Sequence, residues 1–135
     1  MNAVMQTPLH ASEHLPDKLA RGGNVFSADC PARGVLTNVT SRWGVLVLIS
    51  LRGGTLRYSQ IRRKIGGVSE KMLAQTLQSL ERDGFVRRVS MPVVPPHVEY
   101  SLTPMGQEVG QQVQGLTDWI ETNLSAVLAA RGTAA

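Results

Sequence analysis

The sequence predicts an α+β domain that is mostly α-helical, and two patterns lead to this prediction. Apolar residues recur with the helical period through several segments, and Gly-Gly pairs at 53–54 and 66–67 separate some of these segments. The period then changes to an alternation of apolar and polar residues in "FVRRVSM" and "HVEYSL", which is typical of half-buried strands. The predicted order is therefore several helices, a two-stranded hairpin and one further helix.

Composition limits the class of protein. The chain has 135 residues, of which 42% are apolar and 18% charged, as expected for one soluble folded domain. Its longest apolar run, "VLVLI" at 45–49, is much shorter than the roughly 20 residues of a membrane span. The N-terminus lacks the apolar core of a secretory signal. We therefore expect a cytoplasmic protein that does not act at a membrane.

Positive charge is concentrated in the middle of the chain. The net charge is +4 and the pI about 9.8, but residues 42–88 hold ten arginines and lysines against three acids. From Glu99 onward, the chain has four acids and a single basic residue, Arg131. This distribution suggests a polyanionic partner such as nucleic acid. A solvated basic surface would have the same composition, so the charge leaves both interpretations open.

The first third of the chain is predicted to hold an arm and two helices. Residues 1–28 read as a flexible arm. A helix follows in "CPARGVLTNV", where Pro31 suits the first helical position. The next helix, in "SRWGVLVLIS", has Ser41 as its N-cap and is apolar nearly all round, which places it and Trp43 in the core.

Residues 55–84 have the pattern of two helices joined by a tight turn. A short strand at 55–57 leads into a helix at about 59–65, and Gly66-Gly67 supplies the turn. The second helix starts after Ser69 as N-cap and ends at Asp83-Gly84.

A hairpin and a last helix complete the domain. The connection "PVVPP" holds three prolines and should form a stiff projecting tip. Thr103 and Pro104 then start a helix that runs to residue 131. This order is that of a winged helix-turn-helix, which we assign to residues 29–103, with a C-terminal dimerisation helix at 104–131.

An apolar stripe on the last helix favours a homodimer, because it is long enough to cross a partner helix. The alternative is that this helix packs on its own domain. The stripe consists of Met105, Val109, Val113, Leu116, Ile120, Leu124 and Val127.

One face of the helix after Ser69 is predicted to contact double-stranded DNA. At about 100° per residue, three leucines share one side of this helix and four polar side chains the opposite side. Gln pairs with adenine, Lys and Arg with guanine, and cations on neighbouring elements would lie over phosphates. The predicted DNA-binding residues are Ser69, Lys71, Gln75, Gln78, Arg82, Arg62, Arg63, Lys64, Arg87 and Arg88. Alternatively the face is only solvated, and Arg87 or Arg88 pairs across the hairpin with Glu99.

The chain resembles the HxlR-type winged helix-turn-helix transcriptional regulators of bacteria over roughly residues 30–106. The most specific pieces are "VVPPHVEYSLTPMG" and "GVSEKMLAQTLQSLE". The resemblance implies a homodimer that binds an inverted-repeat operator. It also implies that the first helix and the last helix of the chain form the dimer interface.

Cys30 is the single cysteine, so an intramolecular disulfide is impossible. Its place at a helix N-terminus near Arg33 would lower the thiol pKa and favour reaction with oxidants or electrophiles. Some regulators that the chain resembles use a cysteine at this "CP" position as a sensor. The alternative is a small residue buried in a dimer interface.

We predict a DNA-binding regulator rather than an enzyme, with no metal and no cofactor. The sequence shows no paired carboxylates and no nucleophile with a neighbouring base. Two alternatives remain: a winged-helix regulator controlled by a non-redox small ligand, and a winged-helix protein-interaction module.

Overall fold

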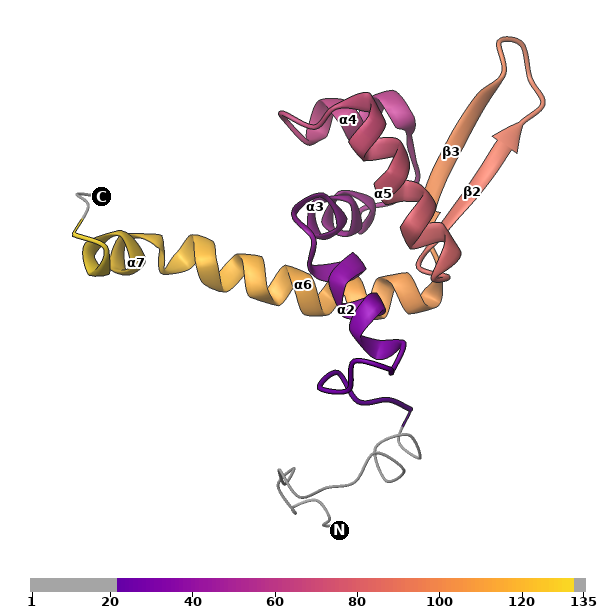
Figure 1. The fold of residues 1–135 in the computed structure, drawn as a ribbon. Helices are drawn as coiled ribbons and strands as arrows, with labels where there is room; N and C mark the ends of the chain where they lie inside the picture. The colour runs from indigo at the N-terminus through magenta and orange to yellow at the C-terminus, as the bar shows by residue number, and fades with distance from the viewer. Residues whose placement is uncertain (1–21, 133–135) are drawn as a thin grey trace. The chain divides into compact units, whose positions relative to one another are not determined.

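The computed structural model describes residues 22–132, which hold six helices and a three-stranded antiparallel sheet (Figure 1). Residues 1–21 of the predicted arm lie outside the described residues. The chain divides into two compact units, one up to Thr37 and one from Asn38 onward. The predicted α+β class and the winged helix-turn-helix order are confirmed. The elements are α2 (Ala32–Thr40), α3 (Arg42–Leu51), β1 (Leu56–Arg57), α4 (Tyr58–Lys64), α5 (Glu70–Arg82), β2 (Val86–Met91), β3 (His97–Leu102), α6 (Pro104–Thr122) and α7 (Leu124–Ala130).

In the first unit, a turn-rich segment leads into α2. The Asn24 side-chain oxygen accepts the Phe26 amide at 3.0 Å, which closes a local turn. The Arg33 guanidinium donates to the carbonyls of Val25 at 3.2 Å and Phe26 at 3.1 Å. The last residues of the predicted arm are thus bonded to the first turns of α2.

Helix α3 supplies much of the core of the second unit. Ser41 caps it by accepting the Gly44 amide at 3.0 Å, as predicted. Val47, Leu48 and Leu51 are fully buried where α3 packs on α5 and α6. The expected all-round burial is only partly confirmed, because Leu46 is exposed and Trp43 is half-buried, with the Arg42 guanidinium over its ring.

The helix pair α4 and α5 follows the predicted boundaries to within about one residue. Gly67 has φ +87°, a left-handed conformation that glycine adopts without strain, and it makes the turn between the two helices. Ser69 caps α5 through the Met72 amide at 3.1 Å, as predicted. Gly84, with φ +84°, ends it.

The sheet has the order β1-β3-β2, with β3 in the middle. Leu56 pairs with Tyr100, and Val86 pairs with Leu102 at the base of the hairpin. The hairpin of β2 and β3 projects beyond α5, and the fully exposed Val94 lies in its proline-rich tip (Figure 1).

The start of α6 is joined to the base of the hairpin. The Thr103 hydroxyl donates to the Gly84 carbonyl at 2.6 Å and accepts the Gly106 amide at 3.0 Å. Gly106 lies so close to the Phe85 carbonyl that a Cβ at this position would clash with it. Glycine is therefore required at this close contact.

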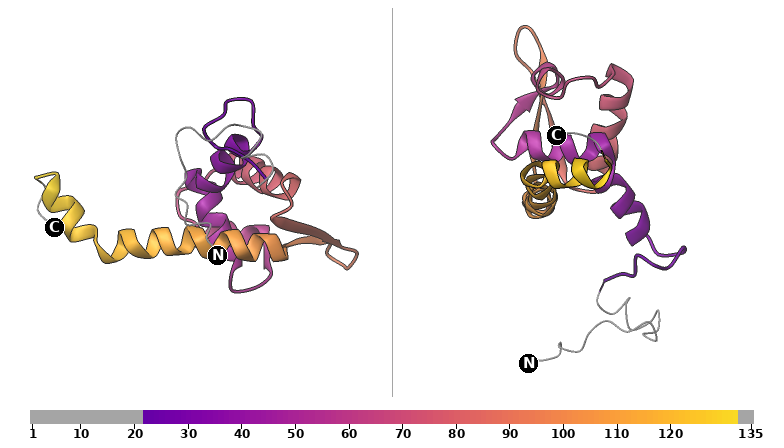
Figure 2. Two further views of the ribbon diagram at one scale, coloured as in Figure 1. Left: turned by 90° about the horizontal axis from the view of Figure 1, so that it is seen from below. Right: turned by 90° about the vertical axis from the view of Figure 1, so that its left-hand side faces the viewer.

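The predicted single helix over 104–131 is wrong in one respect, because it breaks at Asn123 into α6 and α7. Asn123 has φ −107° and ψ 14°, and its side-chain amide donates to the Trp119 carbonyl at 2.8 Å. This local bond competes with helix continuation. Figure 2 shows α6 as a straight rod and α7 turned away from its axis.

In the described part of the chain, no single helix is both long and apolar enough to cross a membrane. The consecutive helices α2 and α3 meet that condition only when they are counted together across the bend between them.

Candidate nucleic-acid interface

Helix α5 separates a buried apolar side from an exposed polar side, as the sequence predicted. Leu73 and Leu80 are fully buried and Leu77 is 2% exposed. The opposite side is exposed to solvent at Lys71, Gln75, Gln78 and Arg82. Polar side chains that are free on a helix surface can contact base edges and phosphates in a major groove.

The first turn of α5 is tied to α4. The Tyr58 hydroxyl donates to the Glu70 carbonyl at 2.8 Å. Burial of the ring and the Glu70 carboxylate raise the pKa of Tyr58, so the hydroxyl stays protonated and remains a donor. Together with the Ser69 cap, this bond fixes the position of the first turn of α5, from which its polar side starts.

The three predicted cations of α4 have different surroundings. Arg63 is exposed to solvent. Arg62 is also exposed, but its Nη1 lies 3.2 Å from Glu70 Oε1 in an ion pair. The Lys64 ammonium donates to the Ser50 carbonyl at 3.3 Å, which turns it toward the end of α3. The structure therefore leaves Arg63 as the cation of α4 that is most free to contact a phosphate.

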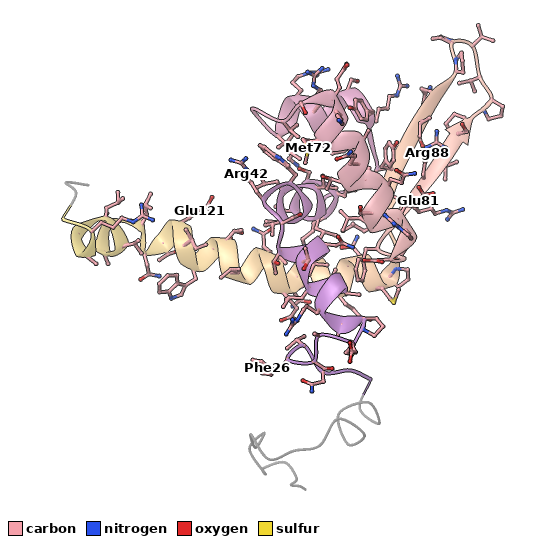
Figure 3. All side chains as sticks on the ribbon, viewed as in Figure 1. Phe26, Arg42, Met72, Glu81, Arg88 and Glu121 are labelled. Carbon is pink, nitrogen blue, oxygen red and sulfur yellow. The ribbon has the colours of Figure 1, made fainter. Side chains whose placement is uncertain are left out.

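The two arginines of the hairpin lie on opposite faces of the sheet, because successive strand residues alternate. Arg88, opposite Tyr100 in the ladder, lines a hollow of about 380 Å³ with Gln78 and Glu81 of α5. Figure 3 shows Arg88 on the hairpin and Glu81 on the neighbouring helix. Arg87 is exposed on the other face. Of the pair, Arg88 belongs to the α5 surface.

Glu99 pairs with neither hairpin arginine among the described residues. Its carboxylate lies 3.2 Å from His97 Nε2 on the same strand, and its ladder partners are Val89 and Arg57. The alternative in which Glu99 forms an ion pair with Arg87 or Arg88 across the hairpin therefore has no support in this structure.

The predicted apolar stripe of the last helix divides into two parts. Met105 is exposed at the start of α6, whereas Val113 is buried, with Gly110, where α6 packs on α3. Beyond this point large apolar side chains are exposed, at Leu116, Trp119, Ile120 and Leu124. The near half of the helix thus packs on its own domain, while the far half offers an apolar surface.

Cys30 is 7% exposed and sits under the loop that precedes α2. Its Sγ accepts the Asn24 amide at 3.3 Å. Backbone N–H groups of Asn24 and Ala32 lower the pKa of the thiol, and burial offsets part of this effect. Of the two predicted sources of the lowered pKa, the helix N-terminus and Arg33, Arg33 instead donates to the backbone carbonyls of Val25 and Phe26.

In the described ranges, no group of three or more His, Cys, Asp or Glu side chains could hold a metal ion. This part of the chain therefore offers no metal centre to the surface around α5.

The profile of the HxlR-like helix-turn-helix family matches residues 38–127, which contain the elements from α3 to α6 and the start of α7. The chain belongs to the HxlR-like helix-turn-helix family. Its relatives are named as regulators of transcription, so this is a non-enzymatic family, as predicted.

Three relatives of this HxlR-like regulator illustrate the match. The HTH-type transcriptional regulator YtfH of Escherichia coli is 66% identical over 109 residues, which cover 81% of this chain and 86% of YtfH. The structure of the transcriptional regulator YtfH from Salmonella typhimurium is 66% identical, with a TM-score of 0.78 over 82% of this chain and 98% of that one. The redox regulator HypR in its oxidized form is 33% identical, with a TM-score of 0.64 over 70% of this chain and 97% of that one.

Two residues of the surface around α5 were not predicted from the sequence, Tyr58 and Met72. Tyr58 touches Glu70 twelve residues away, and no local pattern indicates such a contact. Met72 is 41% exposed next to the polar side of α5 (Figure 3), where an apolar side chain could contact a thymine methyl group. Met72 lies about 100° around the helix from Lys71, and this angle could have indicated that it borders the polar side.

Proposed function

The chain is a helix-turn-helix transcriptional regulator, and we propose that it acts in the cytoplasm as a homodimer on an inverted-repeat operator in double-stranded DNA. The exposed polar side of α5 carries the proposal, because its four long polar side chains oppose a fully packed leucine side. Arg63 and Arg88 flank it and would contact phosphates.

The far half of the last helix supports the homodimer. Leu116, Trp119, Ile120 and Leu124 are each at least 44% exposed. A run of exposed apolar side chains on a helix marks an interaction surface, and a second copy of the chain would cover it symmetrically. Two copies of α5 would then meet half-sites whose centres lie about 10–10.5 bp apart, or a multiple of that spacing.

The proposal is tested on DNA that flanks the gene of this protein. We expect a footprint with two inverted halves, and affinity that falls by about 10³–10⁵ between 50 and 200 mM salt. A single asymmetric footprint would contradict the dimer. A flat salt response would contradict the electrostatic part of the proposal.

A second proposal is that oxidants or electrophiles control the regulator through Cys30. Two observations favour it over control by a non-redox ligand: the lowered pKa of the thiol, and the similarity to HypR, which is described as a redox regulator. Since Cys30 is buried, the covering loop must open before a reagent reaches the sulfur. We favour modification by a small molecule, such as a mixed disulfide, over a Cys30–Cys30 bridge, which needs Cα atoms within about 7 Å.

Diamide treatment of the wild type and of Cys30→Ser tests the redox proposal. Release of DNA by the wild type alone, reversed by dithiothreitol, supports it. Equal DNA binding by both proteins under oxidant rules it out and leaves Cys30 as a packing residue.

A further inference from the structure

The ion pair between Arg62 and Glu70 has no evident role in holding the fold. Its two side chains are 45% and 74% exposed, and ion pairs this accessible contribute little to stability. It joins α4 to the first turn of α5, directly beside the polar side of that helix.

The geometry around the pair is set by the fold. The Tyr58–Glu70 bond of 2.8 Å holds the α5 end of the pair against α4. A hollow of about 380 Å³ opens here, lined by Tyr58, Ser59, Arg62, Arg63 and Glu70. It offers hydrogen-bond donors from Ser59 and both arginines, and one carboxylate.

A hollow of this chemistry on the first helix of a helix-turn-helix lies where that helix crosses the DNA backbone. Phosphate and carboxylate both bind the guanidinium fork with charge-assisted hydrogen bonds. The Glu70 carboxylate is therefore bound to the same Arg62 guanidinium group that a DNA phosphate would bind.

We propose that Glu70 competes with a DNA phosphate for Arg62 and so limits the affinity of the regulator for DNA. This inference rests on the proposed DNA-binding function. While Arg62 is paired with Glu70, it adds no net positive charge at the interface and its contribution to counterion release is cancelled.

The experiment is a double-mutant cycle with Glu70→Gln and Arg62→Ala, with the fold of each variant checked by circular dichroism. Binding is measured by fluorescence anisotropy between 50 and 200 mM salt, on a duplex that the wild type prefers and on an unrelated duplex. Glu81→Gln is the matched control, since Glu81 is an exposed acid on the same side of α5, three turns on, without an ion pair among the described residues.

We expect Glu70→Gln to tighten binding to both duplexes and to steepen the slope of log affinity against log salt by about 0.9, as for one added phosphate contact. The effect should exceed that of Glu81→Gln in the wild-type background. With Arg62→Ala present, the two substitutions should have equal effects.

Three results would overturn the proposal. The first is an equal effect of Glu70→Gln and Glu81→Gln in the wild-type background. The second is weaker binding by Glu70→Gln, which would make Glu70 a positioning residue for Arg62. The third is a change confined to the preferred duplex, which would make Glu70 a reader of base sequence. If the wild type itself shows no salt-dependent DNA binding, the proposed function fails, and this inference fails with it.

Discussion

The side-chain amide of Asn38 donates to the carboxylate of Asp83 at 2.8 Å, across 45 residues of sequence. Asn38 lies near the end of α2, and Asp83 is the C-cap of α5. This bond fixes the far end of α5, as the Tyr58–Glu70 bond fixes its near end. The exposed side of α5 is therefore held at both ends by side chains from other helices.

Asn38→Ala should destabilise the protein, because it leaves the half-buried Asp83 carboxylate without its donor. A hydrogen bond to a charged group contributes about 1.5–3 kcal/mol, and partial exposure places the expected loss at the lower end. Urea unfolding measures the loss. Thr37→Ala, one residue earlier and exposed, is the control. Equal unfolding midpoints of the two variants would show that the Asn38–Asp83 bond adds nothing.

Lys71→Ala and Gln75→Ala should each cost about 1–3 kcal/mol of binding free energy and relax base preference at one position. Arg88→Ala, and more weakly Arg87→Ala, should reduce affinity about equally for all sequences, because phosphate contacts carry no base information. Binding to a set of single-base operator variants distinguishes these outcomes. A changed base preference in the hairpin variants alone would mean that the hairpin, not α5, reads the sequence.

Trp119→Glu should convert the proposed dimer to monomers, because it places a charge in the apolar surface that the partner would cover. Analytical ultracentrifugation across a concentration series measures this change. Gln111→Glu, on the same helix and exposed, is the matched control and should remain dimeric. Unchanged dimerisation of Trp119→Glu would place the interface elsewhere.

The Cys30 thiol should ionise at a lower pH than a free cysteine, whose pKa is about 8.5. The rate of alkylation by iodoacetamide, followed from pH 5 to 10, should therefore reach its plateau earlier than that of a free thiol. Since the thiolate is favoured in the folded state, its stabilisation is complete above the unfolded pKa and is lost as pH falls through the folded pKa. A midpoint at or above that of free cysteine would contradict the role of the Asn24 and Ala32 amides.

Local features were predictable from the sequence because they depend on neighbouring residues. Ser41, Ser69 and Thr103 cap the helices that they were expected to cap, and β3 has the predicted bounds. Each of these depends on a residue type within about one helical turn, or on alternation along a strand.

What the sequence could not indicate depends on contacts between separate elements. Lys64 looks like one of three equivalent cations, but its ammonium reaches Ser50 on another helix, 14 residues away. The pairing of Glu70 with Arg62 depends on the angle between α4 and α5, which no local pattern indicates. The break at Asn123 interrupts an apolar pattern that continues in register on both sides, so periodicity alone could not show it.

Only the far part of α6 is free to bend, because its first half packs on α3 and its start is joined to the hairpin through Thr103 and Gly106. From Gln114 to Thr122 the helix spans about 14 Å at 1.5 Å per residue. A bend of about 12° after Val113 would therefore move its far end by about 3 Å, which is close to the rise of one base pair. In the proposed dimer, a small adjustment where the two copies meet would be amplified along this segment, so that the spacing between the two copies of α5 would depend on the stiffness of one helix.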